Sequence, residues 1–463
     1  MNRAGKLLGR ATEQSGLARA WDSARRGESQ LVVLWGRRRV GKTFLLSHFA
    51  RGKRCVFFAA TQQAEAIELA RLAEAVRRDL GAEASDLAGG AFQSWEAALR
   101  FFAALSRSEG LMVVLDEVPY LARSTPGFAS IVQAAWDHLR SGNLMLVLTG
   151  SAVGIIEEML GSGGALRGRP TLTLRLDPFD LLEARSFLPR LADTEFLEAY
   201  AACGGYPLHL QKWDEGAKLD DNLALLAGTS GGILLEDAES ILSEELADSG
   251  GYSRILAAIG RGRTRPSEIQ ADANQRIEHP LDVLVRSGFV RRSVPVGSPK
   301  ASRPIYEIDD AYLAFWFTVL YSDLAFIEGG QGGPVLKRRA PQWQRHVGWV
   351  FEEAARAHAV RLVKAGELPE DLVVGRWWSV SGQQCEVDVL GLSGVRTKLL
   401  GEAKWQERPL GMRDLSDLAA KRALVPKVDE QPLFALWGRS GVEPSVKKTG
   451  ALGFGLKDVL RAT

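Results

Sequence analysis

The sequence has few cysteines, no long hydrophobic run and almost no net charge. Cys55, Cys203 and Cys385 are widely separated, so neither a disulfide framework nor a cysteine metal site is expected. The longest strongly apolar runs, residues 111–115 and 312–321, are too short to cross a bilayer. The net charge of +2 does not mark the whole chain as a nucleic-acid-binding protein. We therefore expect a soluble cytoplasmic protein with no membrane contact.

The composition is that of an ordinary globular protein, with 46% hydrophobic and 25% charged residues in 463. Apolar runs at residues 31–35, 55–59, 111–115 and 144–148 alternate with helical patterns. This alternation predicts an α/β protein whose parallel sheet binds ligands at the carboxyl ends of its strands. The glycine-rich residues 329–334 are expected to form a linker. The predicted domains are residues 1–178, 179–249, 250–325 and 335–463.

Residues 36–43 have the sequence GRRRVGKT, which fits the phosphate-binding pattern G-x-x-x-x-G-K-[ST]. A predicted strand precedes this loop and a predicted helix follows it, as a P-loop requires. Lys42 should reach the β- and γ-phosphates of ATP, and Thr43 should place its hydroxyl on Mg²⁺. The alternative is a chance match in a glycine-containing loop. The residues expected to bind the nucleotide here are Gly36, Arg37, Arg38, Arg39, Val40, Gly41, Lys42 and Thr43.

Polar residues also follow the later strands of this sheet. Asp116 is expected to hold Mg²⁺, and Glu117 to polarise the attacking water as a catalytic residue. Ser151 is the preferred γ-phosphate sensor, with Thr149 as the second choice and a simple strand-end turn as the alternative. Arg169 is a candidate arginine finger for a neighbouring subunit, unless it is only a solvated surface residue.

Residues 252–308 show three helical patterns followed by two strands, the order of a winged helix. The segment contains ten basic and five acidic residues, a surplus that suits contact with nucleic-acid phosphates. Arg291, Arg292 and Lys300 are expected in or near the wing. The alternative is a module that packs on the ATPase with its arginines in solvent.

Four further residues near the C-terminus suit phosphodiester hydrolysis. Asp388 lies in one predicted strand, and Glu402 and Lys404 lie two residues apart in the next, so they share a face. Glu352 lies on the preceding predicted helix. Three carboxylates can hold Mg²⁺, with Mn²⁺ as an alternative, against a phosphate, and a lysine can stabilise the developing charge. We expect Glu352, Asp388 and Glu402 as metal ligands and, with Lys404, as catalytic residues.

Together these motifs resemble archaeal-type AAA ATPases that continue into a winged helix and a restriction-endonuclease-like domain. The resemblance rests on residues 36–43, the run Leu-Asp-Glu at residues 115–117, Thr-Gly-Ser at residues 149–151 and Gly-Tyr-Pro at residues 205–207. Asp388 and Glu402-x-Lys404 are similar to the PD-(D/E)XK nuclease pattern. The resemblance implies a P-loop AAA-type core, a helical lid, a winged helix and a C-terminal restriction-endonuclease-like α/β domain. It also implies ATP hydrolysis, and it allows a homo-oligomer.

Three functions follow from these expectations. The first is an ATPase coupled to a Mg²⁺-dependent nuclease that acts on nucleic acid, with DNA preferred. The second is an ATP-driven regulatory or signalling switch whose C-terminal domain binds DNA without cleaving it. The third, and weakest, is a defence or mobile-element protein whose self-damaging nuclease waits for a trigger. The sequence identifies neither the polynucleotide nor the trigger.

Overall fold

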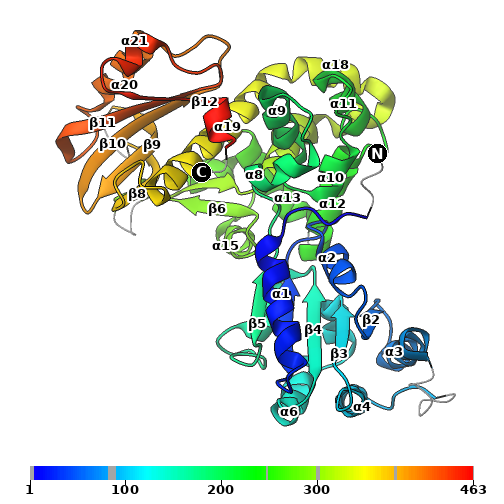
Figure 1. Ribbon diagram of the computed structural model, residues 1–463. Helices are drawn as coiled ribbons and strands as arrows, with labels where there is room; N and C mark the ends of the chain where they lie inside the picture. Colours follow the sequence, from blue (N-terminus) through cyan, green and yellow to red (C-terminus); the bar gives the residue numbers. More distant parts are fainter. Residues whose placement is uncertain (1–4, 82–89, 247–248, 299–302, 380–382, 462–463) are drawn as a thin grey trace. The chain divides into compact units, whose positions relative to one another are not determined.

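The structure is a computed structural model that describes residues 5–81, 90–246, 249–298, 303–379 and 383–461 (Figure 1). The chain divides into two compact units, each with its own sheet. The first comprises Met1–Pro178 and Ile241–Ala247, and the second comprises Phe179–Ser240 and Asp248–Thr463. The finer division into four domains stays a prediction.

A five-stranded parallel sheet in the order β2-β3-β4-β1-β5 forms the centre of the first unit. Its strands are β1 (Gln30–Trp35), β2 (Cys55–Ala59), β3 (Leu111–Asp116), β4 (Leu144–Gly150) and β5 (Leu172–Arg175). β3 and β4 are buried along their whole length, which explains their unbroken apolar sequences. The predicted parallel sheet is thus confirmed. β5 was not expected, because its four residues alternate between half-buried and exposed.

Helices pack on both faces of this sheet. α1 (Ala11–Ala24) crosses it and packs on β1, β4 and β5 (Figure 1). The opposite face contributes Leu31 and Val33 to a core that also contains Trp95 and Trp136. The remaining helices are α2 (Lys42–Phe49), α3 (Glu65–Leu80), α4 (Trp95–Leu105), α5 (Val118–Ser124), α6 (Phe128–Leu139) and α7 (Val153–Leu160).

The second unit begins with helices and a two-stranded hairpin. The helices are α8 (Leu181–Ala184), α9 (Asp193–Cys203), α10 (Pro207–Lys212), α11 (Leu219–Leu226), α13 (Ser249–Gly260), α14 (Pro266–Ala273) and α15 (Glu278–Arg286). α12 (Ile233–Glu245) is divided between the two units, since Ile241–Ala247 belongs to the first. β6 (Val290–Ser293) and β7 (Ile305–Ile308) then pair antiparallel and form the β6–β7 hairpin. The order of three helices and two strands predicted for residues 252–308 is therefore present. Lys300 lies outside the described residues.

The predicted linker at residues 329–334 is wrong, because this stretch is helical. It lies in the π-helical turn Ile327–Gln331 and in α18 (Gly332–Arg338), with a break at Gly330, where φ is 83°. Gly332 packs so closely that a Cβ would lie 1.8 Å from the carbonyl oxygen of Gly228. The glycines here allow a helix to approach another segment, and they do not provide a flexible joint.

One helical stretch in the described residues, Ala311–Arg338, is long and apolar enough to cross a membrane by length and composition alone. It includes α16 (Ala311–Phe315), the π-helical turn Trp316–Leu320 and α18. Its apolar window is 56% buried inside the protein. Trp316 and Phe317 are fully buried, and the indole of Trp316 donates to the carbonyl of Leu235. These features are typical of a core helix in a globular domain.

A second five-stranded sheet, in the order β12-β11-β10-β9-β8, follows the long helix α19 (Ala340–Lys364). Its strands are β8 (Leu372–Trp378), β9 (Glu386–Ser393), β10 (Arg396–Lys404), β11 (Val428–Gly438) and β12 (Leu452–Gly455). β9 is antiparallel to β8 and β10, whereas β10, β11 and β12 are parallel. α19 packs on β8, β9 and β10, and α20 (Met412–Lys421) packs on β9, β10 and β11. The chain ends in the short helices α21 (Pro444–Lys447) and α22 (Leu456–Val459) around β12.

Candidate functional site

The phosphate-loop pattern lies between β1 and α2, where a P-loop belongs. A Cβ on Gly36 would lie 2.0 Å from the carbonyl oxygen of Leu176, so only glycine fits there. Gly41 adopts φ 95° immediately before α2, a helix whose N-terminal end suits a phosphate. Lys42 is buried, and its ammonium donates to the carbonyls of Gly36 at 2.7 Å and Arg37 at 3.0 Å. The loop thus gathers a positive charge and backbone donors around one point.

The rest of the loop is fixed to the surrounding unit. Val40 is buried, and its carbonyl accepts a hydrogen bond from the guanidinium of Arg10 at 3.2 Å. The same nitrogen of Arg10 donates to the carbonyl of Asp177 at 2.6 Å. Arg37 is buried, and Arg39 has a left-handed backbone with φ 70°. A loop held in this way is preorganised for a ligand.

Thr43 and Asp116 meet at the end of β3. The Thr43 hydroxyl donates to the Oδ2 atom of Asp116 at 2.7 Å. Burial raises the pKa of Asp116, the charge of Glu117 adds to this rise, and the hydrogen bond from Thr43 opposes it. A hydroxyl and a carboxylate beside a phosphate loop are the donors that Mg²⁺ uses in P-loop proteins. These two residues fit the predicted cation.

Glu117 and Ser151 connect the tips of β3 and β4. One carboxylate oxygen of Glu117 accepts from the Ser151 hydroxyl at 2.9 Å and from its backbone N–H at 3.2 Å. Glu117 has a left-handed backbone with φ 55°, which is uncommon for a residue with a side chain. The structure therefore brings Ser151 to Glu117, while Thr149 is fully buried within β4.

Arg169 lies apart from this group of contacts. Its guanidinium donates to the Oδ2 atom of Asp137 in α6 at 3.1 Å. The Arg169 side chain is about one quarter exposed, at 24%. The geometry within one chain gives Arg169 a surface ion pair, and the arginine-finger role stays a prediction about a neighbouring copy.

Two of the three residues predicted as metal ligands lie at neighbouring positions of adjacent strands in the second unit. The antiparallel register pairs Val389 with Gly401, so Asp388 and Glu402 follow at neighbouring positions of β9 and β10. Asp388 is only 9% exposed, and its Oδ2 atom accepts from the backbone N–H of Ala403 at 3.0 Å. α19 supplies Glu352 from the helix packed on this sheet.

The charges of these carboxylates act on one another. Burial raises the pKa of Glu352, and the charge of Asp388 raises it further. Burial also raises the pKa of Asp388, with the charge of Glu402 as the next cause. Buried carboxylates that repel one another suit a hard divalent cation such as Mg²⁺ or Mn²⁺. The donor chemistry fits, although within the described ranges no three His, Cys, Asp or Glu side chains are placed to hold an ion.

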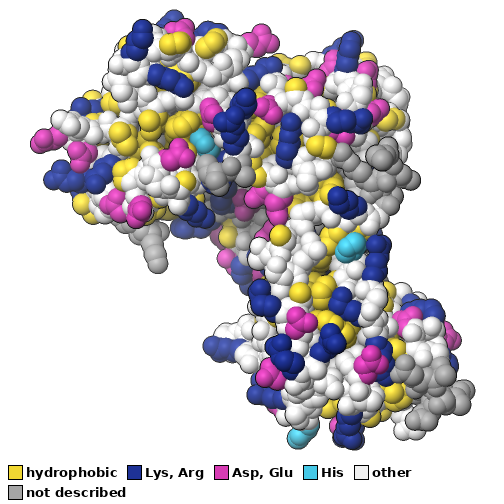
Figure 2. All heavy atoms as spheres, viewed as in Figure 1, with side chains coloured by type: hydrophobic (Ala, Val, Ile, Leu, Met, Phe, Trp, Pro, Cys, Tyr) yellow, Lys and Arg dark blue, Asp and Glu magenta, His cyan; other side chains and the backbone are white. Residues whose placement is uncertain are grey.

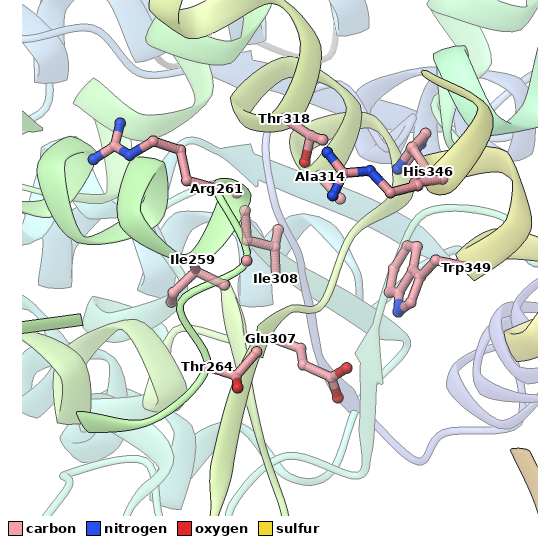
Figure 3. A pocket seen from close by; sticks show the side chains of 12 residues that line it. Ile259, Arg261, Thr264, Glu307, Ile308, Ala314, Thr318, His346 and Trp349 are labelled. Carbon is pink, nitrogen blue, oxygen red and sulfur yellow. The ribbon is translucent and has the colours of Figure 1, made fainter. Parts of the chain in front are cut away.

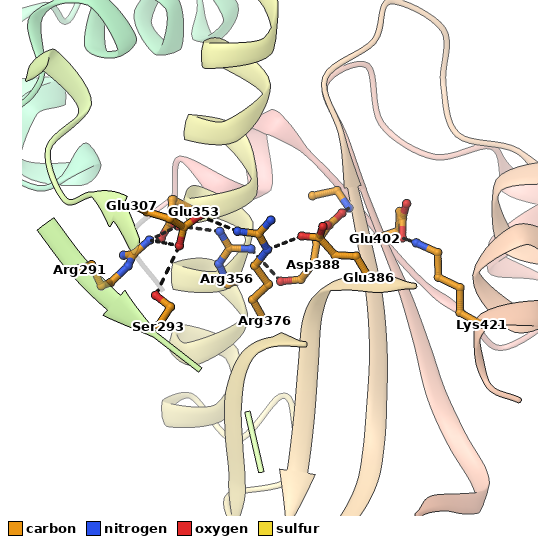
Figure 4. Close-up of polar contacts among 11 residues, drawn as sticks. Arg291, Ser293, Glu307, Glu353, Arg356, Arg376, Glu386, Asp388, Glu402 and Lys421 are labelled. Atoms are coloured by element: carbon orange, nitrogen blue, oxygen red, sulfur yellow. Dashed lines mark hydrogen bonds and ion pairs between the residues drawn. The ribbon is translucent and has the colours of Figure 1, made fainter. Parts of the chain in front are cut away.

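Lys404 differs from the prediction. Its ammonium contacts the Oδ1 atom of Asp414 at 3.0 Å, near the start of α20. Asp414 is buried, and it also accepts from Arg408 and from the backbone N–H of Gly411. The lysine that contacts Glu402 is instead Lys421, the last residue of α20 (Figure 4). Sequence analysis missed Lys421, because no local pattern distinguishes it from other surface lysines at helix ends.

A network of ion pairs connects the β6–β7 hairpin to the C-terminal sheet (Figure 4). Arg291 pairs with Glu353 of α19, and Arg356 donates to Glu353 at 2.7 Å. Burial alone would raise the pKa of Glu353, but Arg356 and Arg291 hold it below its ordinary value. Arg376 of β8 pairs with Glu307 of the hairpin at 2.6 Å and with Glu386 of β9. Arg291, expected to meet phosphates, is thus engaged within the chain.

A cavity of about 210 Å³ lies in the second unit near this network (Figure 3). Arg261, Glu307, His346 and Trp349 contribute to its lining. Burial lowers the pKa of His346 to about 4, so this imidazole is neutral near pH 7. None of the residues predicted for the nucleotide or the metal lines this cavity.

The N-terminal part of the chain matches a known family. Residues 15–213 match the model of an ATPase domain predominantly from Archaea. This part of the chain carries an archaeal-type ATPase domain. Residues 316–421 match a second model, described as archaeal and bacterial proteins of unknown function. The second match covers α19 to α20, so it includes the predicted metal-site residues without assigning them a role.

Whole-chain comparisons add three similar proteins. An uncharacterized protein from Methanocaldococcus jannaschii is 26% identical over 427 residues, which are 89% of this chain and 91% of that protein. The Walker-type ATPase of Pyrococcus abyssi is 21% identical, with a TM-score of 0.48 over 68% of this chain and 97% of the other. An ORC2 protein of Aeropyrum pernix is 16% identical, with a TM-score of 0.43 over 73% and 96%.

Proposed function

We propose that this protein is an AAA-type ATPase that binds and hydrolyses ATP and is coupled to a Mg²⁺-dependent nuclease in its C-terminal part. The substrate is nucleic acid, with DNA favoured. The observation that carries the nuclease half is that Asp388 and Glu402 lie at neighbouring positions of β9 and β10, on the sheet against which α19, with Glu352, packs. The ATPase half is supported by the phosphate loop and by the contacts among Thr43, Asp116, Glu117 and Ser151.

In the ATPase, Lys42 and the loop N–H groups hold the phosphates, and Thr43 with Asp116 would hold Mg²⁺. Glu117 accepts a proton from the attacking water, whose oxygen bonds to the γ-phosphorus while the bond to the β–γ bridging oxygen breaks. Ser151 keeps the Glu117 carboxylate in place through the contact at 2.9 Å. Arg169 acts on the site of a neighbouring copy.

In the nuclease, Glu352, Asp388 and Glu402 would hold the divalent cation, which polarises the scissile phosphate when bound. A water oxygen bonds to phosphorus, the ester P–O bond breaks, the water proton passes to solvent, and the leaving oxygen takes a proton from solvent. The surplus of arginines in residues 252–308 supports contact with the backbone phosphates, and Arg292 is one of the exposed residues that could make it.

The test compares the wild type with Lys42→Ala and Asp388→Asn on single-stranded DNA, double-stranded DNA and RNA, with ATP and Mg²⁺ or Mn²⁺. We expect Lys42→Ala to lose ATP turnover. Asp388→Asn should lose cleavage and keep the ATPase, because the two sites use separate residues. Absence of cleavage by the wild type on every substrate would refute the nuclease half.

A second function is favoured by one observation. In the structure, Glu402 contacts Lys421, and Lys404 contacts Asp414. This arrangement also suits a regulatory switch whose C-terminal part binds DNA without cutting it. Slow ATP turnover with DNA binding that Asp388→Asn leaves unchanged would support the switch.

A further inference from the structure

Lys421 of α20 contacts one of the three carboxylates directly. Its ammonium contacts the Oε2 atom of Glu402, and both side chains are largely buried, 25% and 16% exposed. A cation at the last residue of α20 also suits the helix dipole, but the dipole does not explain the contact with Glu402.

Lys404 contacts Asp414 instead of the carboxylate group. Asp414, its partner, lies seven residues before Lys421 on α20, a separation of about 10 Å along the helix axis. Asp414 holds the first turn of α20 by accepting from the backbone N–H of Gly411 at 3.0 Å, and Arg408 adds a second charge. Burial would raise the pKa of Asp414, but Arg408, this N–H and Lys404 hold it well below its ordinary value. Lys404 thus stabilises the start of the helix.

We propose that Lys421, and not Lys404, supplies the ammonium group of the nuclease site, and that it competes with the divalent cation for Glu402. This proposal rests on the proposed nuclease function. Without the cation, Lys421 neutralises Glu402. When the cation takes Glu402, Lys421 is released to contact the negatively charged phosphate oxygens of the substrate, where a positive charge stabilises the transition state.

The experiment measures Mn²⁺ binding to the full-length protein by calorimetry, and cleavage by the same preparations. The variants are Lys421→Met and Lys404→Met, which remove one ammonium each and keep a side chain of similar length. We expect Lys421→Met to bind Mn²⁺ severalfold more tightly than the wild type, because Glu402 loses its competing charge. The same variant should cleave about a hundredfold more slowly. Lys404→Met should keep both properties and melt at a lower temperature.

Each outcome either supports or overturns the proposed role of Lys421. Unchanged or weaker Mn²⁺ binding in Lys421→Met overturns the proposal, as does a wild-type cleavage rate in that variant. Loss of cleavage in Lys404→Met, at a temperature where circular dichroism shows a folded protein, also overturns it. If the wild type binds Mn²⁺ but cleaves no substrate, and Lys421→Met binds Mn²⁺ more tightly, the nuclease function is refuted. Only the competition at Glu402 is then kept. Lys421→Arg, which retains the charge, should keep wild-type Mn²⁺ affinity.

Discussion

Glu117 shows how single residues organise the nucleotide site. Its left-handed backbone, with φ 55°, costs about 1 kcal/mol relative to an ordinary helical residue. The geometry turns the carboxylate toward Ser151 on the next strand. A Cβ on Gly150, the residue before Ser151, would lie 2.3 Å from Pro119, so glycine is needed for this approach. Unfavourable backbone geometry of this kind is common at functional sites.

The buried carboxylate of Glu352 predicts how the stability of the fold depends on pH. Burial and Asp388 raise the pKa of Glu352 to about 8 in the folded protein, above the value of about 4.3 expected when unfolded. Neutral Glu352 therefore stabilises the metal-free fold most fully at pH values below its unfolded pKa, and this contribution is lost as pH rises through about 8. Glu352→Gln stays neutral at every pH. Between pH 6 and 9 its melting temperature should fall by a few degrees less than that of the wild type.

Thermal denaturation in EDTA checks this difference, with Glu367→Gln at an exposed position after α19 as the control. The control should follow the wild type at every pH. If the melting temperatures of Glu352→Gln and the wild type depend on pH in the same way, the raised pKa of buried Glu352 is contradicted.

Most of the candidate site could be predicted from the sequence, and the exceptions share a cause. The P-loop, Asp116 and Glu117 lie at strand ends, where local sequence fixes their position. Asp388 and Glu402 were found because alternation along a strand fixes the face of each side chain. The partners of Lys404 and Arg291 could not be predicted, because long flexible side chains choose among charges that tertiary packing brings near.

At the scale of elements, the loop of the β6–β7 hairpin is in direct contact with the C-terminal sheet. The backbone N–H of Val296, in the loop of the hairpin, donates to the carbonyl of Arg376 in β8 at 3.0 Å. A Cβ on Gly375 would lie 2.9 Å from the Val296 side chain, so the loop and the strand are in close contact. A hairpin held in this way has less of its surface available to a nucleic acid than an isolated wing.

Arg376 is the residue on which this contact depends most. It pairs with Glu307 of the hairpin and Glu386 of β9, and its side chain is 22% exposed. Arg376→Ala leaves two carboxylates without this partner and should destabilise the second unit by about 2 kcal/mol. Thermal or urea denaturation of the full chain measures the change.

Arg286→Ala is the matched control, because Arg286 is 65% exposed and its partner Asp282, on the same helix, is 63% exposed. Its effect should stay within about 0.5 kcal/mol. Equal stability of the Arg376→Ala and Arg286→Ala variants would show that the network contributes little.

The elements that sequence analysis missed are short and lie at sheet edges. β5 and β12 have four residues each, with no fully buried position. Such strands lack the apolar periodicity that identified β3 and β4. The predicted linker failed for a different reason: the glycines at residues 329–334 serve close packing, and composition alone does not separate the two uses.

At the scale of the whole molecule, the numbers of basic and acidic residues nearly balance, 58 against 56. On the face drawn in Figure 2, Lys and Arg side chains are interspersed with Asp and Glu and do not form one continuous basic surface. This pattern agrees with the net charge of +2. If the protein binds nucleic acid as proposed, binding has to depend on local groups of arginines. Its affinity should then fall only modestly with added salt, because few phosphates are contacted.

The predicted homo-oligomer can be tested through Arg169. If Arg169 completes the site of a neighbouring copy, Arg169→Ala should bind ATP normally and lose turnover, as Lys42→Ala does for a different reason. Mixing the two inactive variants should restore part of the turnover, because some Lys42 sites then face an intact Arg169. ATPase assays across mixing ratios measure this recovery.

Asp137→Ala, which removes the partner of Arg169 at 3.1 Å, is the control for a surface role. It should leave turnover near the wild-type rate. Mixtures that stay inactive at every ratio would argue against action between copies.

α19 carries Glu352 and Glu353 on successive residues of a 25-residue helix. One carboxylate faces the metal-binding candidates, and the other is held by arginines of the hairpin and of α19 itself. Because the two residues are adjacent in one α-helix, their backbones move together. Under the proposed function, a ligand that altered the pair between Arg291 and Glu353 would therefore act one residue away from a proposed metal ligand.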